Sequence, residues 1–219
     1  MTYHKIEGPF MRSEDLKTVD RTKWRNPVVE MLADTPIWVA SEKVDGTNIR
    51  VIWDGYRISF AGRTDRAQLP GPLVEKLESY FLRPGVEEWF EENFPPPTED
   101  SVERLSVVLY GEGYGGKIQS GGKYRADQDF IGFDVSVNGR YLSVANVADI
   151  FERLNVPVLT SYTPTTLTHM IQVVSGGLKS QFGDFTAEGL VARTIEPMYD
   201  QRGNRLIVKL KDVDLGVSE

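Results

Sequence analysis

Apolar and polar positions alternate along a stretch in the first quarter of the chain. Residues 36–40 form a short apolar run, and Ile49, Val51 and Trp53 then alternate with Asn48, Arg50 and Ile52. Strict alternation is typical of a half-buried β-strand. The Asp54-Gly55 pair predicts a tight turn that leads into another strand over residues 56–60. The pattern therefore predicts a strand, a polar turn and a hairpin in that order.

Helical spacing of apolar residues follows, and then more strands. Helices are predicted over residues 72–81, 86–94, 147–154, 167–174 and, behind a Ser13 cap, 13–19. Further strands are predicted over residues 107–110, 130–137, 140–142, 187–194 and 205–211, and the glycine-rich residues 111–123 are expected to form a loop. Hairpins dominate and helices are inserted between them, so the sequence predicts an α+β fold with mostly antiparallel sheets. No repeat or domain boundary is visible, so residues 1–219 are predicted to form one domain.

The amino-acid composition limits which side chains could act as catalytic groups or metal ligands. The chain has no cysteine and two histidines, which excludes disulfides, thiolate nucleophiles and cysteine-bound zinc and disfavours a histidine triad. Catalysis would then depend on lysines, arginines and carboxylates, with a hard metal ion. The net charge of −7 argues against broad, sequence-blind binding to nucleic acid. No bilayer-spanning run or signal peptide is present, so we expect a soluble cytoplasmic protein with no membrane partner.

Candidate functional groups fall at or beside the predicted strand ends: Lys43 with Asp45 and Asn48, then Glu112, then Glu188, then Lys209 with Lys211. Two residues apart in a strand, Lys209 and Lys211 point to one face. Like charges on one face cost free energy unless an anion compensates them, so that face meets either solvent or a phosphate. Taken singly, Glu112 and Glu188 could each cap a turn, hold magnesium or bind a ribose hydroxyl.

Taken in order, these groups resemble the motifs of the covalent nucleotidyltransferase superfamily, which includes polynucleotide ligases and mRNA-capping enzymes. The matching segments are Lys43-Val44-Asp45-Gly46, Tyr110-Gly111-Glu112, Phe130-Ile131-Gly132-Phe133-Asp134, Glu188-Gly189-Leu190-Val191 and Val208-Lys209-Leu210-Lys211. Within the superfamily, the chain is most similar to RNA ligases of the phage Rnl2 type. The features that indicate this group are Gly46-Thr47-Asn48, Gly62-Arg63-Thr64 and the glycine-rich stretch after Glu112.

The resemblance implies a nucleotidyltransferase domain of the ligase and capping-enzyme type. The chain ends eight residues after Lys211, so we expect no C-terminal OB domain. The implied activity is that of an ATP-dependent RNA ligase. In such an enzyme Lys43 attacks the α-phosphorus of ATP, AMP passes from the lysine to an RNA 5′-phosphate, and a 3′-hydroxyl then seals the strand. A lysine amine attacks only when it is neutral, and nearby cations favour the neutral form. The implied cofactors are ATP and Mg²⁺ or Mn²⁺.

Individual roles also follow from the resemblance. The catalytic set is Lys43, Glu188, Lys209 and Lys211. The nucleotide-binding set adds Glu42, Asn48, Arg63, Glu112 and Phe133, and the metal ligands are Glu188 and Asn48. Phe133 would stack on adenine, although strand alternation places it on one face with Ile131 and Val135, where it could equally be a core residue. For Asp45 a turn role is as plausible as a catalytic one.

Other functions fit the same motifs. The alternatives are a DNA ligase, a capping-type guanylyltransferase and a non-catalytic module that binds RNA ends or nucleotides. The expected partners are RNA 5′-phosphate and 3′-hydroxyl ends, with an accessory protein in place of the absent C-terminal domain. We therefore expect strong self-adenylylation and weak joining of simple nicks.

Overall fold

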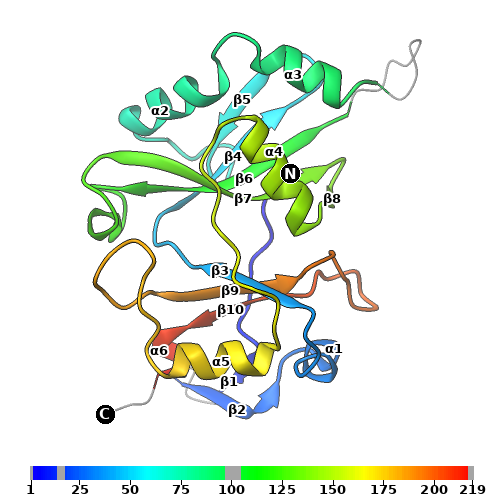
Figure 1. The fold of residues 1–219 in the computed structure, drawn as a ribbon, viewed down its shortest axis with the longest axis vertical. Coiled ribbons are helices and arrows are strands. Elements are labelled where there is room, and N and C mark those ends of the chain that lie inside the picture. The colour runs from blue at the N-terminus through cyan, green and yellow to red at the C-terminus, as the bar shows by residue number, and fades with distance from the viewer. Residues whose placement is uncertain (1, 14–17, 97–104, 217–219) are drawn as a thin grey trace. The chain divides into compact units, whose positions relative to one another are not determined.

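The computed structural model describes residues 2–13, 18–96 and 105–216 (Figure 1). The chain divides into two compact units, each assembled from two stretches of sequence. Unit 1 comprises Met1–Tyr3 and Asp45–Leu159, and unit 2 comprises His4–Val44 and Thr160–Glu219. The chain therefore passes from one unit to the other more than once, and neither unit is a continuous segment.

Unit 1 is built on a five-stranded antiparallel sheet of order β5-β4-β6-β7-β8. Its elements are β4 (Thr47–Trp53), β5 (Ile58–Ala61), β6 (Val107–Gly115), β7 (Gln128–Val137), β8 (Arg140–Tyr141), α2 (Gly71–Phe81), α3 (Val86–Asn93), α4 (Val144–Arg153) and the 3₁₀ turn η1 (Gly121–Lys123). The predicted alternation in β4 is confirmed, because Ile49, Val51 and Trp53 are all buried in one core with α2 and α4. That core covers one face of the sheet, and the alternating side chains of Asn48 and Arg50 lie on the other face.

Glycine-rich residues extend β6 beyond its predicted end. Residues 111–115 continue the strand: all five pair with β7, and residues 111–113 also pair with β4. The expectation of a loop over these five residues was therefore wrong. The space that side chains would occupy is already filled. A Cβ on Gly111 would lie 2.2 Å from the Phe130 ring, and one on Gly113 would lie 2.5 Å from Leu73. Glycine is needed in this strand so that an aromatic ring and a helix can pack closely against the backbone.

A β-bulge changes which face the residues of β7 present. Tyr110 pairs with Asp134 but Gly111 pairs with Gly132, so Phe133 is the extra residue of the ladder. Val135 lies in the core of unit 1, whereas Phe133 contacts the Tyr3 ring outside that core. The sequence placed Phe133 and Val135 on the same face, and this was wrong because one bulged residue reverses the alternation.

Unit 2 contains a three-stranded antiparallel sheet of order β10-β9-β3. Its elements are β1 (Phe10–Arg12), β2 (Val19–Trp24), β3 (Trp38–Glu42), β9 (Gly189–Thr194), β10 (Ile207–Lys211), α1 (Pro27–Met31), α5 (Leu167–Ser175) and α6 (Asp212–Leu215). Apolar residues of the sheet, α1 and α5 form a second core. In β10 Val208 and Leu210 enter that core, so the alternating Lys209 and Lys211 face away from it. The α+β class with antiparallel sheets is confirmed.

The short helix expected over residues 13–19 is replaced at both ends by hairpin structure. The Ser13 N–H donates to the Thr18 carbonyl at 3.0 Å, and Val19 begins β2. The middle of the expected helix, residues 14–17, lies outside the described residues. Ser13 is therefore bonded to Thr18, the residue that precedes β2.

Candidate functional site

Two lysines and a carboxylate from separate segments meet in unit 2. The Lys43 Nζ atom lies 2.7 Å from Oε2 of Glu188, and the Lys211 Nζ atom lies 3.1 Å from Oε1 of the same carboxylate. All three side chains keep between 20% and 30% of their surface exposed. The cluster is thus open to a ligand, yet shielded enough that its charges interact more strongly than they would in bulk water. The structure brings Lys43, Glu188 and Lys211 together although long stretches of sequence separate them.

Backbone pairing fixes the cluster. The Lys43 N–H donates to the Gly189 carbonyl at 2.9 Å, and the Asp212 N–H donates to the Glu188 carbonyl at 3.0 Å. Gly189 has a φ of +144°, and a Cβ there would lie 1.8 Å from the Leu210 carbonyl oxygen. Only glycine fits this backbone conformation beside β10. The Glu188-Gly189 step is therefore needed to bring the carboxylate next to Lys211.

Lys209 adds a third positive charge to the neighbourhood. Burial lowers the pKa of Lys209 below the ordinary lysine value. The charges of Lys211 and Lys43 lower it further, whereas the Glu7 carboxylate acts in the opposite direction. With three lysines and Glu188, the cluster carries an excess of positive charge, which suits a phosphate group.

The carboxylate next to the nucleophile candidate is already bonded. Glu42 is 1% exposed. Its Oε1 accepts from the Ser180 hydroxyl at 2.6 Å, and its Oε2 accepts from the Gln181 N–H at 2.7 Å. Glu42 therefore fixes the loop of residues 178–187, which leads directly into Glu188. The sequence did not identify Ser180 and Gln181, since nothing local links them to Glu42.

The other half of the lysine motif belongs to unit 1. The Asp45 Oδ2 atom accepts from the Ser120 N–H at 3.2 Å, and the Asp45 N–H donates to the Tyr124 hydroxyl at 3.2 Å. A Cβ on Gly46 would lie 2.3 Å from the Gly113 carbonyl oxygen. Asp45 is thus bonded to two residues of unit 1 that lie far along the sequence, and Gly46 permits close approach of the β6 backbone.

Asn48 and Glu112 lie directly opposite each other on β4 and β6, on the sheet face that points away from the core. The Asn48 Oδ1 atom is buried and has no hydrogen-bond partner within the protein. A buried carbonyl oxygen without a partner is costly unless a ligand satisfies it. Phe133, displaced by the bulge, is half-buried beside this face. The structure brings Asn48, Glu112 and Phe133 onto one face of unit 1.

Arg63 lies in an exposed loop of unit 1, and a buried arginine holds that loop. Arg50 is fully buried. Its Nε donates to the Gly62 carbonyl at 2.8 Å, and its Nη2 lies 2.7 Å from the Asp65 carboxylate. Sequence alternation placed Arg50 on the polar face of β4 but gave no sign that it is buried or that it supports Arg63.

The described ranges contain no group of three or more histidine, aspartate or glutamate side chains that would hold a metal ion. Nor does any helix in them combine the length and apolar character needed to cross a bilayer.

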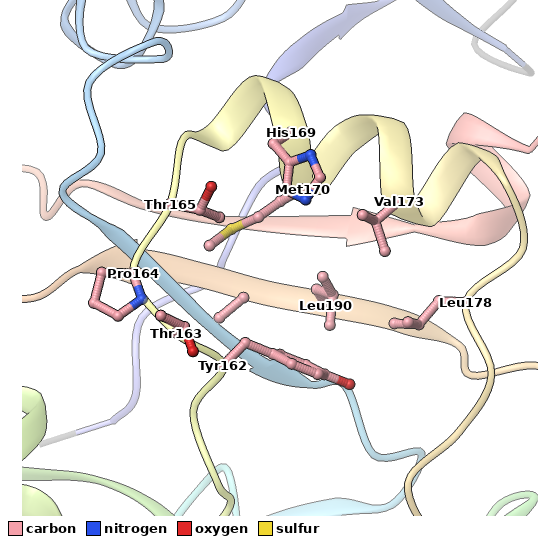
Figure 2. A pocket seen from close by; sticks show the side chains of 10 residues that line it. Tyr162, Thr163, Pro164, Thr165, His169, Met170, Val173, Leu178 and Leu190 are labelled. Atoms are coloured by element: carbon pink, nitrogen blue, oxygen red, sulfur yellow. The ribbon is translucent and has the colours of Figure 1, made fainter.

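A separate hollow of about 390 Å³ lies between α5 and the sheet of unit 2. Figure 2 shows Met170 and Val173 of α5 facing Leu190 of β9, with Tyr162 closing one side. Its lining is mostly apolar and includes none of the predicted site residues.

The chain matches one protein family and resembles solved structures of a known enzyme. A family model for RNA ligase matches residues 36–211. A Naegleria gruberi RNA ligase variant solved with ATP and Mn is 17% identical, with a TM-score of 0.65 over 96% of this chain and 60% of that chain. The same organism's RNA ligase with PPi is 17% identical, with a TM-score of 0.61 over 94% and 55%. A variant with AMP and Mn is 18% identical, with a TM-score of 0.61 over 94% and 55%. These likenesses show the fold, and the chain spans about 60% of the length of the first of these proteins.

Proposed function

Because this chain belongs to the RNA ligase family, we propose that it is an ATP-dependent RNA ligase that forms a lysyl-AMP intermediate. The observation that supports the proposal most directly is the cluster of Lys43, Glu188 and Lys211, with contacts of 2.7 and 3.1 Å. The family match spans all three residues. A reactive amine, a carboxylate and neighbouring cations are the groups that phosphoryl transfer to lysine requires.

In the first step, the neutral Nζ of Lys43 attacks the α-phosphorus of ATP. An N–P bond forms, the bond from that phosphorus to the bridging oxygen breaks, and pyrophosphate leaves while the amine loses its proton to solvent. Lys209 and Lys211 stabilise the negative charge that develops on the phosphate oxygens. Glu188 holds the Lys43 and Lys211 amines in place before the nucleotide binds.

In the second and third steps, the adenylate is transferred and then released. An oxygen of an RNA 5′-phosphate attacks the lysyl-AMP phosphorus, and the N–P bond breaks as Lys43 is regenerated. A 3′-hydroxyl then attacks the RNA phosphorus, so a phosphodiester forms and AMP leaves.

The nucleoside is proposed to bind residues of unit 1. Phe133 would stack on adenine, Glu112 would bind ribose hydroxyls and Arg63 would help to fix the nucleoside. The buried, unpaired Asn48 Oδ1 in unit 1 and the Glu188 carboxylate in unit 2 are each an oxygen donor of the kind that suits Mg²⁺ or Mn²⁺. Such an ion would neutralise phosphate charge. Glu42 would serve the nucleotide through the loop it holds.

Both units are proposed to act as one adenylyltransferase domain of residues 1–219. Each unit is discontinuous in sequence, and each contains some of the proposed residues. Cutting the chain anywhere between residues 45 and 159 would therefore interrupt unit 1 and separate the two stretches of unit 2.

RNA ends are the proposed substrate, and an accessory protein is the proposed aid in holding them. The net charge of −7 disfavours unaided binding of a polyanion. Adenylylation is accordingly proposed to be efficient and joining of plain nicks weak. A cytoplasmic location is also proposed, and the lack of cysteine is compatible with a reducing compartment.

The test is incubation of adenylate-free protein with α-labelled ATP and Mg²⁺ or Mn²⁺. We expect a labelled protein and released pyrophosphate, both lost in Lys43→Ala and both kept in Lys179→Ala. Lys179 is a suitable control because its side chain is 83% exposed and pairs only with the loop residue Asp184 among the ion pairs described. Labelling from GTP alone would instead indicate a guanylyltransferase. Nucleotide binding without pyrophosphate release would indicate a non-catalytic binder.

Substrate preference needs a second measurement. Pre-adenylylated protein would be mixed with matched RNA and DNA nicks that carry a 5′-phosphate. Transfer of AMP to RNA supports the proposal, whereas transfer to DNA alone would make the protein a DNA ligase.

A further inference from the structure

The third residue of the chain is buried in unit 1. Tyr3 is 9% exposed, and its hydroxyl donates a 2.8 Å hydrogen bond to Oδ2 of Asp134. Asp134 is itself fully buried. A carboxylate removed from water requires hydrogen-bond donors, so this contact fixes the N-terminal segment to β7.

The Tyr3 ring also contacts the aromatic residue proposed to meet the base. The Tyr3 and Phe133 centroids lie 5.3 Å apart with an interplanar angle of 69°, an edge contact. Tyr110 lies 4.7 Å from Tyr3 and Tyr141 lies 5.8 Å from it on the same measure. Edge and tilted arrangements at these distances are attractive. Tyr3 is therefore at the centre of an aromatic group formed with three residues that lie far along the sequence.

The bulge gives this contact its importance. Phe133 is the residue of β7 without a register partner on β6, so the regular ladder does not determine its direction. Its neighbour Asp134 is the residue that Tyr3 binds. One side chain thus contacts both residues at the bulge, one through a hydrogen bond and the other through its ring.

We propose that Tyr3 is a positioning residue for nucleotide binding, which acts by fixing the direction of the Phe133 ring. This inference rests on the proposed function, in which Phe133 stacks on adenine. Tyr3 is not assigned a contact with the nucleotide. Its loss would allow the Phe133 ring to adopt other rotamers, and the entropy of ordering that ring would then oppose ATP binding.

Kinetics of self-adenylylation test the proposal. Tyr3→Ala should raise the KM for ATP about 3- to 10-fold, the range expected for loss of one or two aromatic contacts. The rate at saturating ATP should change less than twofold, because Lys43 and its neighbours belong to unit 2. Tyr3→Phe keeps the ring and loses only the Asp134 hydrogen bond, so it should restore most of the affinity.

Tyr56→Ala is the matched control, since Tyr56 is 64% exposed and has no assigned role. If Tyr3→Ala fails to fold, Tyr3→Leu fills much of the space without an aromatic ring and should show the same KM increase. An unchanged KM in a folded Tyr3→Ala or Tyr3→Leu variant would overturn the inference. The same rise in KM and the same fall in saturating rate in both Tyr3→Ala and Tyr3→Phe would overturn it as well, because they would indicate general destabilisation. Absence of any label in the wild-type protein would instead count against the proposed function.

Discussion

Gly189→Ala is the substitution whose outcome the structure constrains most tightly. Gly189 has a φ of +144°, and an added Cβ would lie 1.8 Å from the Leu210 carbonyl oxygen, against the 3.4 Å or more of an ordinary contact. Leu210 belongs to β10, whose last ladder pair joins Lys211 to Gly189. The neighbouring backbone cannot rotate away as a flexible side chain could. The end of β10 would therefore have to separate from β9.

Two effects should lower the free energy of unfolding in Gly189→Ala. A non-glycine residue held in such a conformation costs about 1–3 kcal/mol, and loss of a ladder hydrogen bond costs about 1 kcal/mol. The free energy of unfolding should fall by about 3 kcal/mol, which lowers the urea midpoint by roughly 1–2 M for a slope near 2 kcal/mol/M. Gly177→Ala is the matched control, because Gly177 also has a positive φ, +82°, but nothing lies within 4 Å of its Cβ position. It should cost only about 1 kcal/mol.

Two assays follow the substitution. Urea unfolding gives the stability difference, and α-labelled ATP gives lysyl-AMP formation in variants that are still folded. Separation of β10 from β9 would move Lys211 away from Glu188, so Gly189→Ala should lose labelling while Gly177→Ala keeps it. The reasoning is refuted if the two alanine variants are equally stable, or if folded Gly189→Ala is labelled at the wild-type rate.

Three other predictions concern charged residues. Lys211→Met should slow lysyl-AMP formation about 100-fold in single-turnover labelling, because it removes a cation expected to stabilise the transferred phosphate; a change below threefold would contradict that role. Lys209→Met should stabilise the fold at pH 7 by no more than about 1 kcal/mol, because Lys209 stays partly exposed. Burial lowers the pKa of Lys209, so folding penalises its charged form at neutral pH, and the advantage of methionine should shrink as pH rises toward about 10.4 in urea unfolding; a constant difference would oppose this. Arg50→Met should lower the free energy of unfolding by about 2 kcal/mol, since it leaves the Gly62 carbonyl without its donor, whereas Asp65→Asn should lower it much less in the same measurement because Asp65 is exposed.

Local periodicity was sufficient to predict the secondary structure and the buried residues of elements that bury one regular face. The alternation of β4 predicted the buried residues Ile49, Val51 and Trp53, and the spacing behind Ser143 predicted α4. Ser143 caps that helix through a 3.3 Å bond from the Asn146 N–H. In these elements the preference of the local sequence and the packing of the fold agree.

Periodicity failed where packing between distant segments decides the conformation. Gly111–Gly115 have low strand propensity, yet they form a strand because Phe130 and Leu73 take up the space of absent side chains. One extra residue at Phe133 reversed the faces of β7. Neither the bulge nor the packing against glycine has a signature within a short window of sequence.

In the candidate site, the residues proposed to act on the nucleotide were predicted, whereas the residues that hold them in place were not. The resemblance of the ordered motifs to the nucleotidyltransferase superfamily predicted which lysines and carboxylates belong together, and Lys43, Glu188 and Lys211 do meet. The residues that hold them were not predicted. Tyr3, Ser180 and Arg50 act through single contacts with distant partners, and such contacts leave no repeating pattern in one sequence.

The sheet of unit 2 has a consequence for how the chain is made. Its central strand β9 begins at Gly189, whereas its neighbour β3 ends at Glu42. During synthesis from the N-terminus, every strand of the five-stranded sheet leaves the ribosome before β9 exists. The edge of β3 beside Lys43 therefore stays unpaired until β9 and β10 are synthesised. A nascent chain that stalls or ends before β9 would leave this edge exposed, and exposed strand edges favour aggregation.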